Sequence, residues 1–323
     1  MSSPHASSPA APPLSGSSLL VRSTDGFPLG ARVYEPEGPA RATVLVHGAM
    51  ATPQRFYRAF AADLAKSNLR VITYDYRGIG ESRTGSLRGF RASMTEWATK
   101  DAAAATNLAL SYSEPLLLAG HSFGGQLLGL IDTPARVRAI ALVGSQFGYY
   151  GHWPEPRRTL YGAVWSALVP ATVSLLGHYP GWLGFDVDLP GGVARQWALW
   201  CASPGYLLDY HTDAQDRLRN INCPVLFYSF TDDDFAPKAS VDAYLATLRG
   251  ARVVHRRFEP GALGRENVGH FGYFRAGVAP SLWQETAEFF DDALEGRRTS
   301  LRSRAGLSIE MEEVEADLAY GRA

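Results

Sequence analysis

The 323-residue chain has few of the features that identify disulfide-rich, nucleic-acid-binding or cationic membrane-surface proteins. It contains only two cysteines, Cys201 and Cys223, which exclude a disulfide framework and a cysteine-based zinc site and are typical of a reducing compartment. The formal net charge is −1, so no excess of basic residues indicates binding to nucleic acid or to an anionic membrane.

The sequence also has no clear targeting segment and no long apolar run. Residues 1–17 are rich in Ser, Pro and Ala and have neither the basic region nor the apolar core of a signal peptide, which predicts a disordered tail. The longest apolar stretch, 162–177, has 16 residues and contains Pro170, whereas a membrane span needs roughly 20 residues. We therefore expect a buried or lid helix broken at Pro170, no membrane span and a cytoplasmic protein.

What the sequence does contain is an alternation of short apolar segments with segments of helical spacing. Two segments at 18–23 and 28–36 predict strands joined by a turn. Further strands are expected at 42–48, 70–78, 115–120, 137–146, 223–230 and 251–260, and helices at 56–67, 94–112, 122–131, 239–249 and 281–296. This alternation predicts an α/β fold with a mostly parallel sheet flanked by helices and an antiparallel leading edge.

The alternation is interrupted between 147 and 218, where five of the seven tryptophans lie and no buried strand is evident. We interpret this segment as a helical cap inserted between two late strands. The predicted organisation is therefore a disordered tail (1–17), the first part of the core (18–146), the aromatic cap (147–218), the second part of the core (219–296) and a charged tail (297–323). In that last tail, helical spacing of Leu307, Met311, Val314 and Leu318 is compatible with a short helix, and a frayed end is an equally good explanation.

A glycine-rich turn carries the first chemical signal. Gly120-His121-Ser122-Phe123-Gly124 matches the pattern G-x-S-x-G, directly after an apolar strand and directly before a helical segment. In that context the glycines permit a strained strand-to-helix turn that exposes the serine hydroxyl above the sheet. An ordinary glycine-rich turn is the alternative, but it does not require a strand before it and a helix after it. The pattern predicts that Ser122 is a nucleophile.

A nucleophilic serine needs a base, and the base needs an orienting acid. His270 lies in the loop between the last expected strand and the last expected helix, from which it can reach back to Ser122. Asp232, Asp233 and Asp234 follow another expected strand, and the residues alone leave the choice among them open. They lack the spacing of a calcium loop, so a cation site is disfavoured.

The oxyanion that forms during acyl transfer needs hydrogen-bond donors. His47-Gly48-Ala49 ends an expected strand, and Gly48 allows a turn that could point the Ala49 N–H into the site. The residue after the nucleophile, Phe123, would supply the second N–H.

Taken together, "HGA", "YDYRGIGES", "GHSFGG", "DDDFAP" and "GHFG" resemble, in this order and spacing, the α/β-hydrolase superfamily. The chain is similar to the serine-nucleophile branch that contains monoacylglycerol lipases and serine aminopeptidase-like proteins, and to an uncharacterised family of predicted α/β hydrolases. The resemblance covers residues 18–296. It implies the α/β-hydrolase fold and the catalytic roles expected above for Ser122, His270, Ala49 and Phe123. The family's acid stands four residues before the proline of D-x-x-x-P, which selects Asp233. The resemblance implies no cofactor and no metal.

The expected function is that of a serine hydrolase that forms an acyl-enzyme with a small-molecule ester, thioester or amide whose acyl part is apolar. An acyltransferase with the same triad and a non-catalytic binding protein are the alternatives. The residues expected to line the substrate pocket are apolar or aromatic and belong mostly to the cap: Met50, Tyr149, Trp153, Trp165, Trp197, Trp200 and Phe271.

Overall fold

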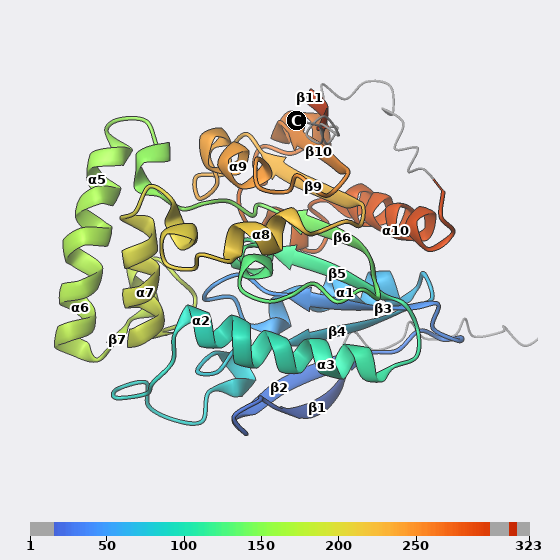
Figure 1. The fold of residues 1–323 in the computed structure, drawn as a ribbon, viewed down its shortest axis with the longest axis horizontal. Helices are drawn as coiled ribbons and strands as arrows, with labels where there is room; N and C mark the ends of the chain where they lie inside the picture. The colour runs from blue at the N-terminus through green and yellow to red at the C-terminus, as the bar shows by residue number, and fades with distance from the viewer. Residues whose placement is uncertain (1–15, 298–309, 315–323) are drawn as a thin grey trace, which may run out of the picture.

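A nine-stranded mixed sheet forms the centre of the molecule (Figure 1). The computed structural model describes residues 16–297 and 310–314. The strand order is β1-β2-β4-β3-β5-β6-β9-β10-β11. The bounds are β1 Ser17–Arg22, β2 Pro28–Tyr34, β3 Ala42–His47, β4 Leu69–Tyr74, β5 Leu116–His121, β6 Val137–Val143, β9 Val225–Phe230, β10 Val253–Phe258 and β11 Glu310–Val314.

The six central strands, from β4 to β10 in the sheet order, are mutually parallel. Every residue of β3, β5 and β9 is buried, because helices cover both faces of a parallel sheet. Strands β1 and β2 form an antiparallel hairpin at one edge, and β2 is antiparallel to β4. The prediction of a mostly parallel sheet with an antiparallel leading edge is confirmed.

The opposite edge corrects the expectation for the C-terminal segment. Strand β11 pairs antiparallel with β10, so Met311 and Val314 lie in a strand and not in a helix. The unpaired edge of β10 offers backbone N–H and C=O groups with which an extended segment can form a ladder. Leu307 and Leu318, the other two residues of the proposed helix, lie outside the described residues.

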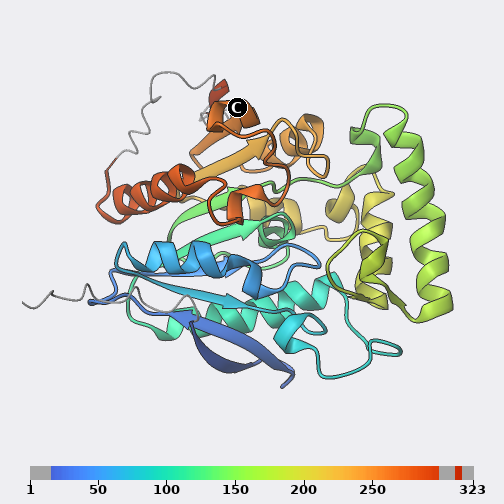
Figure 2. The same cartoon turned by 180° about the vertical axis from the view of Figure 1, so that it is seen from behind.

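The flanking helices separate the core into two layers. On one face lie α1 (Arg58–Ala65) and α10 (Pro280–Leu294), seen in front in Figure 2. On the other lie α3 (Ala103–Ser111), α8 (Ala214–Arg219) and α9 (Lys238–Leu245), seen in front in Figure 1. A cluster of buried side chains fills each layer, one around Trp97 and Tyr244 and the other around Phe60 and Phe289.

Helices α5 (Arg157–Ala163), α6 (Val169–Leu176) and α7 (Gly191–Cys201) form a cap at one end of the sheet, in the connection between β6 and β9 (Figure 1). A two-stranded sheet, β7 (His178–Tyr179) with β8 (Leu189–Pro190), closes the cap below α6. The short helices η5 (Tyr150–His152), η7 (Gly181–Leu183) and η8 (Tyr206–Asp209) lie in the same connection.

The first cap helix differs from the expectation. Arg157–Leu176 is one continuous helix, because a π-helical segment, η6 (Val164–Leu168), precedes Pro170 and places the proline in the first turn of α6, where its missing N–H is tolerated. The break predicted at Pro170 is therefore wrong. Val169 and Val173 are buried, but most of the helix is exposed, and by length and composition alone it is long and apolar enough to cross a membrane.

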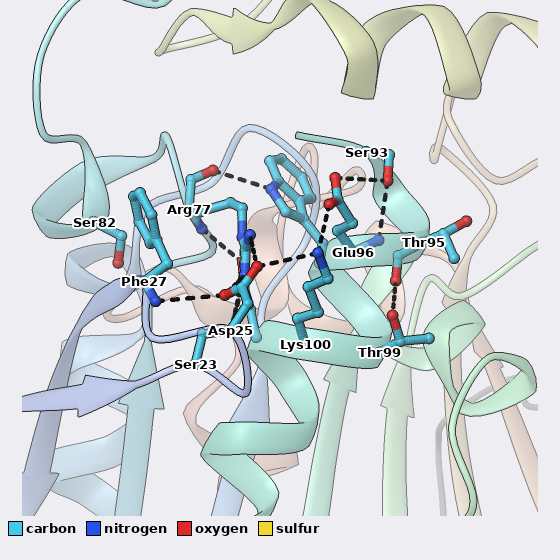
Figure 3. A network of polar contacts seen from close by, with 12 residues as sticks. Ser23, Asp25, Phe27, Arg77, Ser82, Ser93, Thr95, Glu96, Thr99 and Lys100 are labelled. Atoms are coloured by element: carbon cyan, nitrogen blue, oxygen red, sulfur yellow. Dashed lines mark hydrogen bonds and ion pairs between the residues drawn. The ribbon is translucent and has the colours of Figure 1, made fainter. Parts of the chain in front are cut away.

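An ion-pair network around the buried Arg77 and Asp101 holds the loop that follows β4 (Figure 3). The Arg77 guanidinium contacts Asp101 at 2.6 Å and Asp25 at 2.8 Å, and the Trp97 Nε1–H donates to the Arg77 carbonyl at 3.0 Å. Arg77 thereby ties the β1–β2 turn to the helix that runs from α2 (Met94–Glu96) into α3. The next residue, Gly78, packs so closely on β8 that a Cβ there would lie 2.7 Å from the Pro190 side chain. The network thus holds the loop at Gly78, against which β8 of the cap packs.

Candidate active site

Ser122 occupies a strained turn between β5 and α4 (Phe123–Gln126). Its φ of 52° and ψ of −113° lie outside the regions that non-glycine residues ordinarily adopt. The turn is tightly packed, because a Cβ at Gly124 would collide with the carbonyl of His47 at the end of β3. Such strain persists only where the surroundings enforce it, and it is concentrated at functional sites. The geometry agrees with the turn that the G-x-S-x-G pattern predicts.

His270 and Asp233 form a buried, oriented pair. The His270 Nδ1 lies 2.8 Å from Asp233 Oδ2. The other carboxylate oxygen, Oδ1, accepts the N–H groups of Phe235 at 2.9 Å and Ala236 at 3.0 Å. These backbone donors fix the carboxylate plane, so that one oxygen faces the imidazole and holds its Nδ1 as the donor.

The two neighbouring aspartates have different surroundings. Asp232 Oδ2 accepts the N–H groups of Val268 at 2.8 Å and Gly269 at 2.9 Å, which anchors the loop that carries His270. Asp234 is exposed and forms an ion pair with Arg157 on the cap. Only Asp233 contacts the histidine among these three, in agreement with the choice that the D-x-x-x-P pattern implies.

Ser122 and His270 line one small chamber under the cap, with Ala49, Met50 and Phe123. Its volume is about 30 Å³, which is room for a few water molecules at most. The remaining wall consists of two glutamines and four aromatic side chains: Gln126, Gln146, Phe185, Trp197, Phe235 and Phe271.

A chain of hydrogen bonds passes beneath this chamber. The Ala49 N–H donates to Tyr57 Oη at 2.7 Å, Tyr57 Oη lies 2.9 Å from His121 Nδ1, and His121 Nε2 lies 2.9 Å from the carbonyl oxygen of His270. Because that carbonyl can only accept, Nε2 of His121 carries the hydrogen. Burial lowers the pKa of His121 well below its ordinary value, so the ring is neutral and its Nδ1 accepts from Tyr57.

This chain corrects one expectation about the oxyanion donors. The hydrogen of the Ala49 amide is already committed to Tyr57, so the amide is not free to bind a substrate oxygen in this arrangement. The Phe123 amide stands at the first position of α4, where a helix leaves its N–H groups without a partner in the helix, and it lines the chamber. The sequence gives no signal for the Tyr57 contact, which depends on the fold of η1 (Gln54–Tyr57) against the end of β3.

We expect the Tyr57→Phe variant to be less stable than the wild type by about 2–4 kcal/mol, because it leaves the Ala49 N–H and the His121 Nδ1 buried without a partner. Urea unfolding measures this loss. Tyr244→Phe is the matched control, since that equally buried hydroxyl makes one bond, to the Gly125 carbonyl at 2.8 Å. Equal losses in the two variants would contradict the chain of hydrogen bonds.

The predicted pocket residues fall into three groups. Met50, Trp197 and Phe271 line the chamber. Trp153 and Trp165 line, with Trp197, a neighbouring cavity of about 250 Å³ beneath α5. Tyr149 and Trp200 line neither cavity, which contradicts the expectation for both.

The two exceptions have physical reasons. Trp200 is 1% exposed and packs against Tyr206 and His211 inside the cap, while Tyr149 packs against Tyr150 and His152 in the connection before α5. Sequence reasoning missed Phe185 and Phe235 in the chamber wall. Phe235 directly follows the aspartate run and could have been inferred from it, but no local pattern distinguishes Phe185 from the other aromatic residues of the cap.

A family model described as the alpha/beta hydrolase family matches residues 43–280, the stretch that contains the Ser122 turn, Asp233 and His270. The chain belongs to the alpha/beta hydrolase family. Within the described residues of this alpha/beta hydrolase, no group of three or more His, Cys, Asp or Glu side chains is placed to hold a metal ion.

Solved structures of other proteins show the same fold. An esterase from Exiguobacterium antarcticum is 16% identical with a TM-score of 0.55, covering 85% of this chain and 98% of its own. A thermophilic esterase from Thermogutta terrifontis is 19% identical with a TM-score of 0.57, covering 86% and 99%. A bromoperoxidase from Bacillus anthracis is 17% identical with a TM-score of 0.52, covering 86% and 100%. No curated protein sequence matches this chain. At these identities the likeness concerns the fold, and reaction and substrate have to be argued from the site.

Proposed function

We propose that this alpha/beta hydrolase is a serine hydrolase that forms an acyl-enzyme on Ser122 and acts on an ester, thioester or amide with an apolar acyl part. One observation carries the proposal: Ser122, on its strained turn, and His270, oriented by Asp233, come from separate parts of the chain and line one chamber. A merely structural turn does not need a buried histidine held by a carboxylate beside it.

In the proposed reaction, Ser122 Oγ attacks the substrate carbonyl carbon while His270 Nε2 accepts its proton. Asp233 accepts the Nδ1–H and stabilises the imidazolium that results. In this reaction the Phe123 N–H donates to the oxyanion and stabilises it. The tetrahedral intermediate then collapses as His270 returns the proton to the leaving group. Water, activated by the same histidine, finally hydrolyses the acyl-enzyme.

The cavity beneath α5 supports an apolar acyl part. It adjoins the chamber through shared walls at Gln146, Phe185, Trp197 and Phe235, and its other lining is mainly aromatic and aliphatic. An acyl chain placed there leaves water for apolar contacts, which contributes about 0.8 kcal/mol per buried methylene group. Among the described residues that line it, the one Asp, Glu, Lys or Arg residue is Asp234, which is paired with Arg157.

We expect an alkyl fluorophosphonate to label the wild-type protein at one serine, and p-nitrophenyl esters to be hydrolysed faster as the acyl chain lengthens to fill the cavity. Mass spectrometry of the labelled peptide and initial rates across the ester series measure both effects. Absence of labelling, beside a serine hydrolase that labels under the same conditions, would contradict the proposal. A preference for acetyl or charged acyl groups would contradict the apolar part alone. Product analysis with an added alcohol separates hydrolysis from acyl transfer.

A further inference from the structure

The chamber at Ser122 cannot hold a substrate in the arrangement described. Its volume is about 30 Å³, whereas pockets that bind small molecules usually measure about 300–1,000 Å³. Two larger cavities flank it: the acyl cavity of about 250 Å³ beneath α5, and a second cavity of about 260 Å³. The second cavity is more polar and includes Thr52, Trp182, Asp186 and Arg275 in its wall. A substrate of this size therefore fits at Ser122 only if a side chain between these spaces moves.

Four aromatic side chains separate the chamber from the two cavities. Trp197 and Phe235 stand between the chamber and the acyl cavity, and Phe271 stands between the chamber and the polar cavity. Phe185 lines all three spaces. Moving this one side chain would join the chamber to both cavities at once.

Three of these side chains are tied to the catalytic residues or to a helix. Trp197 lies within α7, and Phe271 directly follows His270. The backbone N–H of Phe235 donates to Asp233 Oδ1 at 2.9 Å. The rings of Phe235 and Phe271 also contact the His270 ring, with centroids 5.2 Å and 5.1 Å away, so their displacement would disturb the His270–Asp233 pair. The Phe185 ring has its aromatic contacts with Trp197 and Tyr179 instead.

Phe185 lies on a short loop whose two ends are fixed. Tyr179 pairs with Leu189 between β7 and β8, and Asp188 accepts the Gly181 N–H at 3.0 Å and forms an ion pair with Arg83 at 3.1 Å. Gly184, directly before Phe185, has a φ of 124°, which is accessible to glycine and strained for other residues.

The Phe185 ring packs from outside against the core cluster around Trp97 and Tyr244. It is half-buried and makes a tilted contact with Trp197 at 5.6 Å and an edge contact with Tyr179 at 6.1 Å between ring centroids. These contacts are apolar, and the phenyl ring has no hydrogen-bonding group, so no hydrogen bond of the side chain breaks when the ring rotates outward.

We propose that Phe185 is the gate of the active site and determines which acyl chains reach Ser122. The proposal rests on the serine-hydrolase function proposed above. With Phe185 displaced, the three spaces form one cleft that fits an ester of an apolar acid with a polar leaving group. The acyl chain lies beneath α5, and the leaving group lies toward Thr52, Asp186 and Arg275.

The test compares how fast Ser122 is labelled by a methyl and by a dodecyl fluorophosphonate. In Phe185→Ala the second-order rate constant for the dodecyl probe should rise by roughly tenfold or more, and that for the methyl probe by less, because the acyl cavity opens fully. In Phe185→Trp the dodecyl rate constant should fall below the wild-type value. Trp182→Ala is the matched control: it removes a larger aromatic side chain from the same segment, but one that lines only the polar cavity and is 78% exposed.

Each result has a separate meaning. Dodecyl rate constants that stay at the wild-type value in both Phe185 variants, or that change equally in Trp182→Ala, would overturn the gate. If circular dichroism shows that Phe185→Ala does not fold, the dodecyl rate constant of Phe185→Trp still decides the test. If the methyl probe fails to label even the wild type, the proposed function fails and not only the gate.

Discussion

Replacement of Ser122 by alanine is expected to lower kcat for every hydrolysed ester by about 10⁴-fold or more, because the acyl-enzyme can no longer form. The fold should be retained. The strain at this position depends on the positive φ of the backbone and not on the hydroxyl, so alanine and serine carry nearly the same cost. Initial rates with p-nitrophenyl esters and thermal unfolding of the same preparations measure the two effects.

Ser145 offers a matched control for this variant. It follows β6 at the same end of the sheet, is fully buried and lies against Gly125 in the turn after the nucleophile, but it does not line the chamber. Ser145→Ala should therefore leave kcat within a few-fold of the wild type. Activity above a few per cent in Ser122→Ala, measured after removal of trace wild-type enzyme, would show that the nucleophile is elsewhere.

The geometry of the proposed triad could be predicted from the sequence because each of its residues lies in a local pattern. The glycines around Ser122 determine a turn within a few residues. The carboxyl ends of parallel strands lie at the same edge of the sheet, and this does not depend on the structure of the cap. Asp233 and His270 each follow such a strand, so their meeting depends on the sheet order and little else.

The errors and omissions concern contacts that depend on tertiary packing. Nothing near Ala49 in the sequence indicates that the Tyr57 hydroxyl occupies its N–H, because that contact needs η1 to fold back on β3. Proline ordinarily ends a helix, which is the basis of the break predicted at Pro170. The helix continues because the π-helical segment η6 precedes the proline, and the sequence does not reveal that segment. The aromatic residues of the cap have no periodicity that separates Trp165, which faces a cavity, from Trp200, which is buried among its neighbours.

Separate replacement of three adjacent aspartates tests which carboxylate orients the proposed base, His270. Asp233→Asn should lower kcat by about 10⁴-fold, because an amide in place of the carboxylate no longer stabilises the protonated imidazole and can hold His270 in the wrong tautomer. Asp234→Asn should remain near the wild-type rate, since this side chain is exposed and its ion pair with Arg157 lies outside the chamber.

Asp232→Asn is the informative intermediate. The amide oxygen that replaces Asp232 Oδ2 can still accept the Val268 and Gly269 N–H groups, but more weakly than a carboxylate. The loop that carries His270 should therefore loosen, while His270 keeps its contact with Asp233. We expect a loss of about tenfold in kcat for this variant, small beside the loss at Asp233, because positioning is impaired while the chemistry is kept. Measured kcat values in the reverse order, with Asp233→Asn the most active of the three, would mean that the 2.8 Å contact to His270 holds the loop and that a different carboxylate supports the base.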